Sequence, residues 1–461
     1  MRMSSAGATV LLGVVVGIAL TVGMTASAFG GMKKGPYLIY GGANTQMDVL
    51  WQTETEEVDI LEWGLAPDDL TGSCVSVEYE DDHQHRETIV DLLPGTLYHY
   101  RVNAGGEYHR GTFLTAPPAD ADEVKFLVYG DTRSDEDHLE DIEDHNEVCG
   151  SIVSAYTADP ESQTFLLHVG DFVYDGDEES HWAGQYFARE IDGSPTNMLP
   201  MQANIPILGT MGNHERQGDL FRKYWPYPVV ADRYWSFDYG PVHIAVVDQY
   251  VDYDEGSAQL TWLANDLASS TKEWKFILLH EPGWSAGDPG NNNNEDVKNY
   301  IQPLCVAHGV DMLIAGHNHN YALAWVSGVW HVTSGGGGGP LDDVDPDHPN
   351  VLAAGKTFQF CKVHIRAEVL VCDVIEPGGT LVHRFSNLEG PMDYVWVNLE
   401  WDGDEDGSWA KPFNTLEEGV VDVADGGKIH IQPGTSSEVL EISKGVTLWA
   451  PNGSAVIGLP R

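Results

Sequence analysis

The pattern of apolar and polar positions along the chain changes near residue 120. Before that point, apolar residues alternate with polar ones in short segments such as 47–51 and 96–102, and turn residues separate the segments. Alternation with a period of two is typical of strands that bury one face. We therefore expect residues 33–118 to form a domain of short β-strands.

After residue 122 the apolar residues come in continuous runs. Runs this short suit strands that are buried on both faces of an α/β sheet, and residues 258–268 between two of them have helical spacing. We expect an α/β domain over residues 122–388. The apolar runs are 124–129, 165–169, 205–208, 243–247, 276–279 and 312–315.

The end of the chain carries a different pattern. We interpret residues 389–408 as an acidic linker and expect residues 409–461, which resemble the opening coil of a right-handed parallel β-helix, to form a small β-helix-like module. Residues 402–407 begin like a calcium loop, but Phe413 stands at the twelfth position, where an EF-hand requires Glu. This excludes an EF-hand and favours the linker.

Residues 1–28 have the features of a secretory signal peptide. Arg2 precedes an apolar run over residues 9–24, and Ala26-Ser27-Ala28 fits a cleavage site. The apolar run is short for a membrane span, which needs about 20 residues, although an uncleaved anchor remains the alternative. We expect a protein that is secreted, periplasmic or held at the cell surface, with no membrane span after signal removal.

The charge balance is strongly acidic, with 24 Lys and Arg against 71 Asp and Glu and a net charge of −47. A broad basic surface for nucleic acid is therefore excluded, because that mode of binding needs clustered cations. We interpret the acidic residues as a hydrated surface, with calcium binding as the alternative. Such a surface repels anionic ligands unless cations gather locally.

The five cysteines include no CxxC pair, which argues against a zinc–thiolate site. Cys361 and Cys372 lie in two neighbouring apolar runs, and a two-residue turn at Arg366-Ala367 would place them opposite each other in a hairpin. A disulfide between them and two buried free thiols are equally compatible with the sequence.

Residues that commonly bind metals follow five of the apolar runs. Because ligand sites of open α/β sheets lie at the carboxyl ends of strands, these residues should meet in one crevice. All offer oxygen or nitrogen, which favours iron(III), manganese or zinc over copper(I), and they are too many for one ion. The set is Asp131, Asp171, Tyr174, Asn213, His280, His317 and His319.

The same residues carry a family resemblance. Asp131, Gly-Asp-x-x-Tyr at 170–174, Gly-Asn-His-Glu at 212–215, His280 and Gly-His-x-His at 316–319 resemble the ordered motifs of the calcineurin-like metallophosphoesterases. Tyr174 makes the chain most similar to purple acid phosphatases, and residues 93–98 resemble the tyrosine corner of a fibronectin-III-like β-sandwich. The resemblance covers roughly residues 34–385 and implies a multidomain protein with such a sandwich before an α/β metallophosphoesterase domain.

The resemblance also implies roles for individual residues. Asp131, Tyr174 and His319 would hold an iron(III)-type ion, while Asn213, His280 and His317 would hold a divalent ion such as zinc, manganese or iron. Asp171 would bridge the two ions. His214 would contact the phosphate and protonate the leaving oxygen, and Glu215 would orient a ligand.

Two residues depart from the family pattern. Arg133 stands where purple acid phosphatases usually have Gly, and Trp284 where the family often has Tyr. Arg133 has two interpretations: it donates to the phosphate of the substrate, or it pairs with Asp135 or Asp137. His168 lies within an apolar strand, and we interpret it as structural.

The function implied is hydrolysis of small phosphate esters, as in acid phosphatases, by a hydroxide that two metal ions activate. One alternative is a phosphodiesterase that acts on nucleotides or lipid head groups with the same metals. An alternative of another class is an exported binding protein with a degraded enzyme domain, whose C-terminal module binds a glycan or a partner protein.

Overall fold

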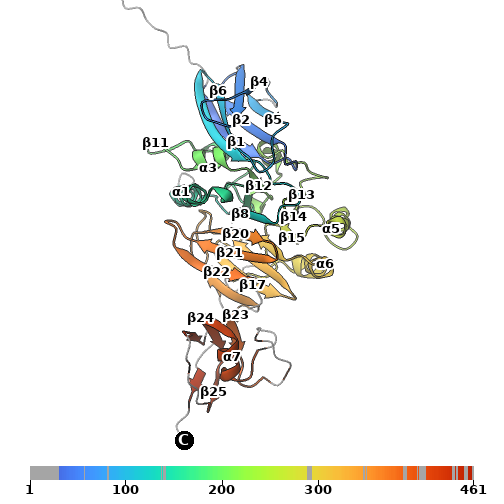
Figure 1. Ribbon diagram of the computed structural model, residues 1–461, viewed down its shortest axis with the longest axis vertical. Helices are drawn as coiled ribbons and strands as arrows, with labels where there is room; N and C mark the ends of the chain where they lie inside the picture. Colours follow the sequence, from blue (N-terminus) through green and yellow to red (C-terminus); the bar gives the residue numbers. More distant parts are fainter. Residues whose placement is uncertain are drawn as a thin grey trace, which may run out of the picture.

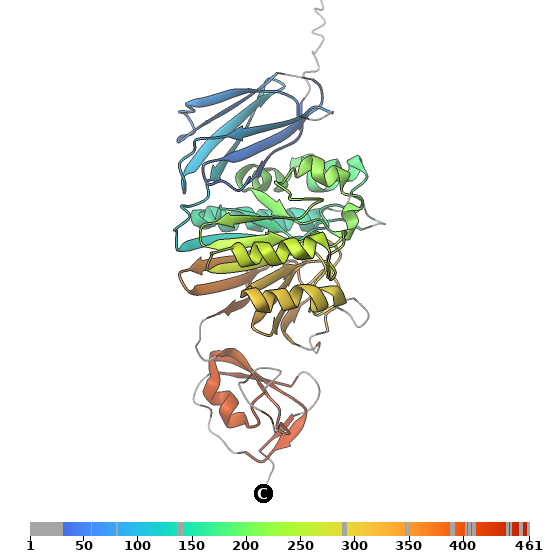
Figure 2. The same ribbon diagram turned by 90° about the vertical axis from the view of Figure 1, so that its right-hand side faces the viewer.

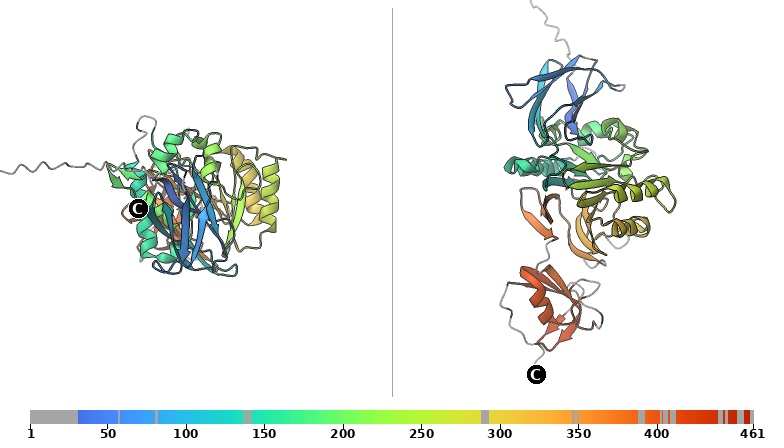
Figure 3. Two further views of the ribbon diagram at one scale, coloured as in Figure 1. Left: turned by 90° about the horizontal axis from the view of Figure 1, so that it is seen from above. Right: turned by 45° about the vertical axis from the view of Figure 1, so that its right-hand side comes forward.

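The computed structural model consists of three bodies that follow one another along its longest axis (Figures 1 and 2). A β-sandwich lies at one end, a larger α/β body lies in the middle and a small β module lies at the other end, as the oblique view of Figure 3 also shows. The structure describes residues 31–56, 58–79, 82–135, 138, 142–287, 293–345, 348, 350–387, 392–401, 403, 407, 412–438, 442, 445–450 and 455–458.

The N-terminal body is the expected fibronectin-III-like sandwich. Its apolar core contains Trp51 from one sheet and Leu61 and Phe113 from the other. The backbone N–H of Leu93 donates to the hydroxyl of Tyr98 at 3.0 Å, which fixes the expected tyrosine corner. The sheets are β1 (Met32–Ile39), β2 (Met47–Thr53) and β5 (Gln84–Ile89), and β4 (Gly72–Ser76), β3 (Asp59–Gly64), β6 (Leu97–Ala104) and β7 (Glu107–Leu114).

Two facing sheets form the middle body, as expected for an α/β metallophosphoesterase domain. Phe126 of one sheet packs against Phe276 of the other, with ring centroids 5.9 Å apart. The six-stranded sheet has the order β12 (Ile207–Gly209), β9 (Leu166–His168), β8 (Glu123–Tyr129), β20 (Phe360–Arg366), β21 (Val369–Ile375), β22 (Leu381–Ser386). The seven-stranded sheet has the order β13 (Trp235–Tyr239), β14 (Val242–Val246), β15 (Trp274–Leu278), β16 (Met312–Ala315), β18 (Val329–Ser334), β17 (Tyr321–Val326), β19 (Val351–Gly355).

Helices cover the outer faces of these sheets (Figure 2). In β15, Phe276 packs between the sheets whereas Ile277 packs against Leu263 and Cys305 of the covering helices, so both faces of the segment 276–279 are apolar. Helix α5 confirms the segment expected at 258–268, and its N-cap Ser257 accepts from the N–H of Leu260. The helices and short elements are α1 (Glu143–Ala158), α2 (Glu179–His181), α3 (Met198–Asn204), α4 (Asp219–Tyr224), α5 (Ala258–Ser269), α6 (Gln302–His308), η1 (Pro160–Ser162), η2 (Trp182–Tyr186), η3 (Asn213–Glu215), η4 (Val297–Ile301), β10 (Glu190–Ile191) and β11 (Ser194–Pro195).

The hairpin of β20 and β21 turns later than the sequence suggested. Arg366 pairs with Val369, so the turn residues are Ala367 and Glu368 instead of Arg366 and Ala367. This moves the register by two residues and places Cys361 opposite Val374 and Cys372 opposite Val363. Both cysteines are buried free thiols, the second of the two alternatives, and they lie diagonally across the hairpin.

The C-terminal body consists of parallel strands stacked in the manner of a β-helix. Lys428 pairs with Thr447, and Gly434 pairs with Ala455, so successive coils stack on each other. Strand β23 pairs in parallel with β24, although it falls within the residues expected as linker. The earlier start follows from packing, because Val395 and Val397 complete the apolar core with Ile429. The elements are β23 (Met392–Val397), α7 (Leu416–Asp422), β24 (Val423–Ile431), β25 (Gly434–Ser436), β26 (Thr447–Trp449) and β27 (Ala455–Ile457).

Outside the described residues lies the segment 1–28 that was expected to be a signal peptide. Among the helices that are described, none is both long enough and apolar enough to span a membrane.

Candidate metal centre

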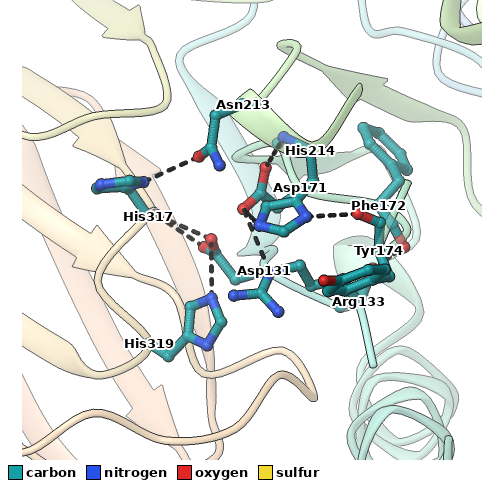
Figure 4. A network of polar contacts seen from close by, with 12 residues as sticks. Asp131, Arg133, Asp171, Phe172, Tyr174, Asn213, His214, His317 and His319 are labelled. Atoms are coloured by element: carbon teal, nitrogen blue, oxygen red, sulfur yellow. Dashed lines mark hydrogen bonds and ion pairs between the residues drawn. The ribbon is translucent and has the colours of Figure 1, made fainter. Parts of the chain in front are cut away.

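The candidate metal-binding residues meet where the carboxyl ends of both sheets face each other (Figure 4). Asp131, Asp171 and Asn213 follow β8, β9 and β12 of the six-stranded sheet. His280 follows β15 of the seven-stranded sheet, and His317 follows β16. The crevice is thus assembled from five strand ends, as the strand-end rule predicted.

Asp131 and Asp171 lie side by side because their loops continue the pairing of β8 with β9. The N–H of Asp131 donates to the carbonyl of Gly170 at 3.0 Å. Both aspartates have positive φ angles, 57° for Asp131 and 55° for Asp171, which turn their carboxylates out of the strand direction. The two carboxylates and the ring of His280 offer ligand atoms within 4.8 Å of one another. This spacing allows one cation to contact all three.

A second group of donors converges on the amide oxygen of Asn213. Its Oδ1 lies 3.1 Å from Nε2 of His280 and 3.1 Å from Nδ1 of His317. Nδ1 of His280 donates to the carbonyl of Val169 at 2.7 Å, which leaves Nε2 directed at the crevice. Such a hydrogen bond from the far ring nitrogen is what orients histidine ligands in metal sites.

His319 is oriented in the same way on the other side of Asp131. Its Nδ1 lies 2.7 Å from the carbonyl oxygen of Pro340, while its Nε2 lies 3.7 Å from Oδ1 of Asp131. The glycine run after β18 allows this approach, since a Cβ on Gly339 would come within 2.8 Å of the His319 ring. A Cβ added to Gly335 or to Gly337 would lie only 2.2 Å from a backbone oxygen.

Tyr174 and His214 lie next to each other beside this donor set. Their ring centroids are 5.4 Å apart, and Nδ1 of His214 donates to the backbone oxygen of Tyr174 at 2.5 Å. Nε2 of His214 is therefore directed toward Asp171, with 4.0 Å between Nε2 and Oδ2. Burial lowers the pKa of His214, although the charge of Asp171 acts in the opposite direction.

Arg133 extends into the crevice. Its Nε lies 3.6 Å from Oδ2 of Asp171, and its guanidinium lies over the Tyr174 ring at 6.0 Å from the centroid. Within the described part of the chain, this Nε has no hydrogen-bond partner although it is buried. Of the two residues suggested as salt-bridge partners, Asp137 lies outside the described residues. Arg133 thus presents a cationic donor at the donor set, as its phosphate-binding interpretation requires.

The electrostatics of the three central groups are coupled. Burial acts to lower the pKa of His280, but the charges of Asp171 and Asp131 raise it to about 10. Burial likewise opposes ionisation of Asp171, and the charge of His280 outweighs it, so the pKa of Asp171 is lowered. The pKa of Asp131 is raised by burial and by the charge of Asp171. Bound cations would relieve the repulsion between the carboxylates of Asp131 and Asp171. The donor set therefore suits metal ions both by its negative charge and by its oxygen and nitrogen ligand atoms.

Two supporting residues complete the site. Glu215 accepts from the N–H groups of Asp171, Phe172 and Gly212, at 2.9, 2.8 and 2.7 Å. Gln249, which the sequence analysis missed, accepts from the N–H of His280 at 2.8 Å. It follows the run 243–247, the one apolar run that is followed by none of the predicted site residues. The strand-end rule points to this part of the chain, but the contact of Gln249 with the backbone of His280 is visible only in the structure.

Comparisons with known proteins agree with this geometry. Residues 124–321 match the family model described as calcineurin-like phosphoesterase, and residues 34–115 match that described as purple acid phosphatase, N-terminal domain. Purple acid phosphatase 18 of Arabidopsis thaliana is 25% identical over 333 residues, which cover 63% of this chain and 68% of that protein. Acid phosphatase type 7 of Homo sapiens is 25% identical over 326 residues, covering 63% and 70%.

A solved structure supports the fold. The purple acid phosphatase from yellow lupin (Lupinus luteus) seeds superposes with a TM-score of 0.65 over 77% of this chain and 74% of its own, at 18% identity. The two matched family models, the named relatives and the shared fold lead to one conclusion. This chain is a purple acid phosphatase-like member of the calcineurin-like metallophosphoesterases, and hence a metal-dependent phosphoesterase hydrolase.

Proposed function

We propose that this chain hydrolyses phosphate monoesters at a centre of two metal ions, in the manner of an acid phosphatase. The observation that carries the proposal is the convergence of oxygen and nitrogen donors from both sheets on one buried crevice, with Asp131, Asp171 and His280 at its middle. The acidic surface of the protein repels phosphate esters, so bound cations would also provide the attraction that a net charge of −47 removes.

The proposed ligands fall into two groups around Asp171. Asp131, Tyr174 and His319 would hold one ion, of the iron(III) type. Asn213, His280 and His317 would hold a divalent ion, namely zinc, manganese or iron(II), because a ring nitrogen of each histidine lies 3.1 Å from Oδ1 of Asn213. Asp171 lies between the groups and would contribute to both.

Two cations bound there would neutralise charge on the phosphoryl oxygens and lower the pKa of a water molecule toward neutrality. The side chains around them have separate tasks. Arg133 would donate to a phosphoryl oxygen, since its guanidinium is held at the crevice. His214, whose Nε2 faces Asp171 while Nδ1 is held by Tyr174, would deliver a proton to the leaving alcohol oxygen.

The proposal is tested with purified protein loaded with iron together with zinc or manganese. Visible absorption and metal analysis of one sample come first, followed by turnover of p-nitrophenyl phosphate and bis(p-nitrophenyl) phosphate. We expect two ions per chain, a visible band that Tyr174→Phe abolishes, and faster turnover of the monoester. A metal-loaded protein that turns over neither ester would overturn the proposal, and faster turnover of the diester would favour a phosphodiesterase.

We also propose that the protein is exported. The support is the sequence of residues 1–28, with its apolar run and the Ala26-Ser27-Ala28 site. N-terminal sequencing of the protein recovered from its native cells tests this. A start at Phe29 is expected, and an intact Met1 would contradict cleavage.

A further inference from the structure

Every backbone polar group of Gly170, Asp171 and Phe172, the loop that presents Asp171, has a hydrogen-bond partner. The carbonyls of Gly170 and Asp171 accept from the N–H groups of Asp131 and Thr132, at 3.0 Å each. Glu215 accepts from the N–H groups of Asp171 and Phe172. The remaining two groups are the N–H of Gly170 and the carbonyl of Phe172.

His168 satisfies both remaining groups, one directly and one through Thr132. Nδ1 of His168 accepts from the N–H of Gly170 at 3.2 Å. Nε2 of His168 lies 3.3 Å from Oγ1 of Thr132, and this hydroxyl donates to the carbonyl of Phe172 at 2.9 Å. Because the hydroxyl proton is used on Phe172, Nε2 must be the donor to Thr132. The contacts therefore require one neutral tautomer of His168, protonated on Nε2.

The packing around His168 leaves its ring one position. The ring stacks on Phe172 at 3.5 Å between centroids with an angle of 11°, and it meets the Tyr129 ring at 4.9 Å. The side chain is fully buried. Burial lowers the pKa of His168 well below its ordinary value, which agrees with a neutral ring. A ring held in this way can fix the positions of the groups that it contacts.

We propose that His168 and Thr132 form a clamp that holds the loops of Asp131 and Asp171 together, so that both carboxylates face the same crevice. Thr132 follows Asp131 directly, and Gly170 precedes Asp171, so one ring spans both loops. His168 thereby acts as a positioning residue, and the clamp rests on the proposed function of these carboxylates as metal ligands. This role differs from the purely structural interpretation of His168 that its apolar strand suggested.

The test measures metal binding, independently of turnover. Mn²⁺ is titrated into metal-free protein by calorimetry for His168→Asn and Thr132→Val, which remove parts of the clamp. Thr132→Ser keeps the hydroxyl. His145→Asn is the matched control, because His145 is buried against Tyr129 and Tyr186 in the same cluster, yet neither of its ring nitrogens has a hydrogen-bond partner in the described structure.

We expect His168→Asn and Thr132→Val to weaken Mn²⁺ binding roughly 10- to 100-fold, as is usual when a group supporting a ligand is lost. Thr132→Ser and His145→Asn should bind Mn²⁺ within a few-fold of the wild type. On p-nitrophenyl phosphate at saturating Mn²⁺, the first two variants should lose kcat with little change in KM. Wild-type Mn²⁺ affinity in both His168→Asn and Thr132→Val would overturn the clamp.

Two further outcomes are informative. If His168→Asn does not fold, shown by circular dichroism, the pair Thr132→Val and Thr132→Ser decides, since only Ser keeps the hydroxyl; equal affinity in the two overturns the clamp. If the wild type binds two Mn²⁺ ions but hydrolyses neither ester, the proposed phosphatase function fails, while the binding data alone still decide whether the clamp exists.

Discussion

The Nε2 atom of His280 lies 3.4 Å from the Oδ1 atom of Asp171. His280 follows a strand of the seven-stranded sheet and Asp171 a strand of the six-stranded sheet, so this contact joins the two halves of the middle body at the candidate site. Neither half alone presents a complete set of donors. The site therefore depends on how the two sheets pack.

Asp171→Asn should abolish most of the activity, because Asp171 is the carboxylate proposed to contact both ions. We expect kcat to fall roughly 1,000-fold or more, since several kcal/mol of charge stabilisation would be lost. Metal analysis of the purified variant should find less than the full complement of ions. A variant with wild-type turnover and two ions per chain would contradict the proposed role of Asp171.

Arg133→Met should weaken productive binding of phosphomonoesters. A charge-assisted hydrogen bond contributes about 1.5–3 kcal/mol, so kcat/KM should fall roughly 10- to 100-fold. Arg133→Lys should be intermediate, because it keeps the charge and loses the fork of donors. The control is Arg222→Met, which removes an exposed cation paired with Asp219 on α4. Equal kcat/KM in Arg133→Met and wild type would exclude a substrate contact.

Lys34 joins the N-terminal sandwich to the middle body. Its fully buried ammonium contacts Glu179, Gln52 and Tyr224. Lys34→Met should lower the free energy of unfolding by about 2 kcal/mol, less than for a fully buried pair because Glu179 is 36% exposed. The double variant with Glu179→Gln should lose less than the sum of the single variants. Urea unfolding measures each value, and strict additivity would show that the pair is not coupled.

His243 should make stability depend on pH. Its ring nitrogens each lie 2.8 Å from a carboxylate, of Asp238 and Asp266, and although burial acts in the opposite direction, these contacts raise the pKa of His243 to about 9. The unfolded value is lower, near 6.5, so the stabilisation is complete below pH 6.5 and is lost as pH rises through 9.

The measurement compares wild type with His243→Gln by urea unfolding of metal-free protein at pH 6 and pH 10. We expect the substitution to cost about 2 kcal/mol at pH 6 and much less at pH 10, a value reduced because Asp238 is half exposed. A cost that is equal at both pH values would show that the charge of His243 contributes nothing.

The sequence by itself determined which residues form the candidate site and in which kind of fold. Asp131, Asp171 and His280 were identifiable because each lies within two residues of the end of an apolar run, and parallel strands place their carboxyl ends at one edge. The tyrosine corner at Tyr98 and helix α5 were identifiable for a similar reason, since each depends on residues only a few positions apart. Features that depend on residues a few positions apart can be predicted from a short segment of the sequence.

The tertiary structure decided what depends on pairing between distant segments. The register of β20 with β21 placed Cys361 and Cys372 diagonally across the hairpin instead of directly opposite each other, because a turn that begins one residue later shifts the pairing by two. Strand β23 emerged within an expected linker because its valines complete a core with Ile429. The roles of His168 and Gln249 became visible only in the structure. Both residues accept hydrogen bonds from backbone N–H groups, and a contact to the backbone does not depend on which side chain stands at that position.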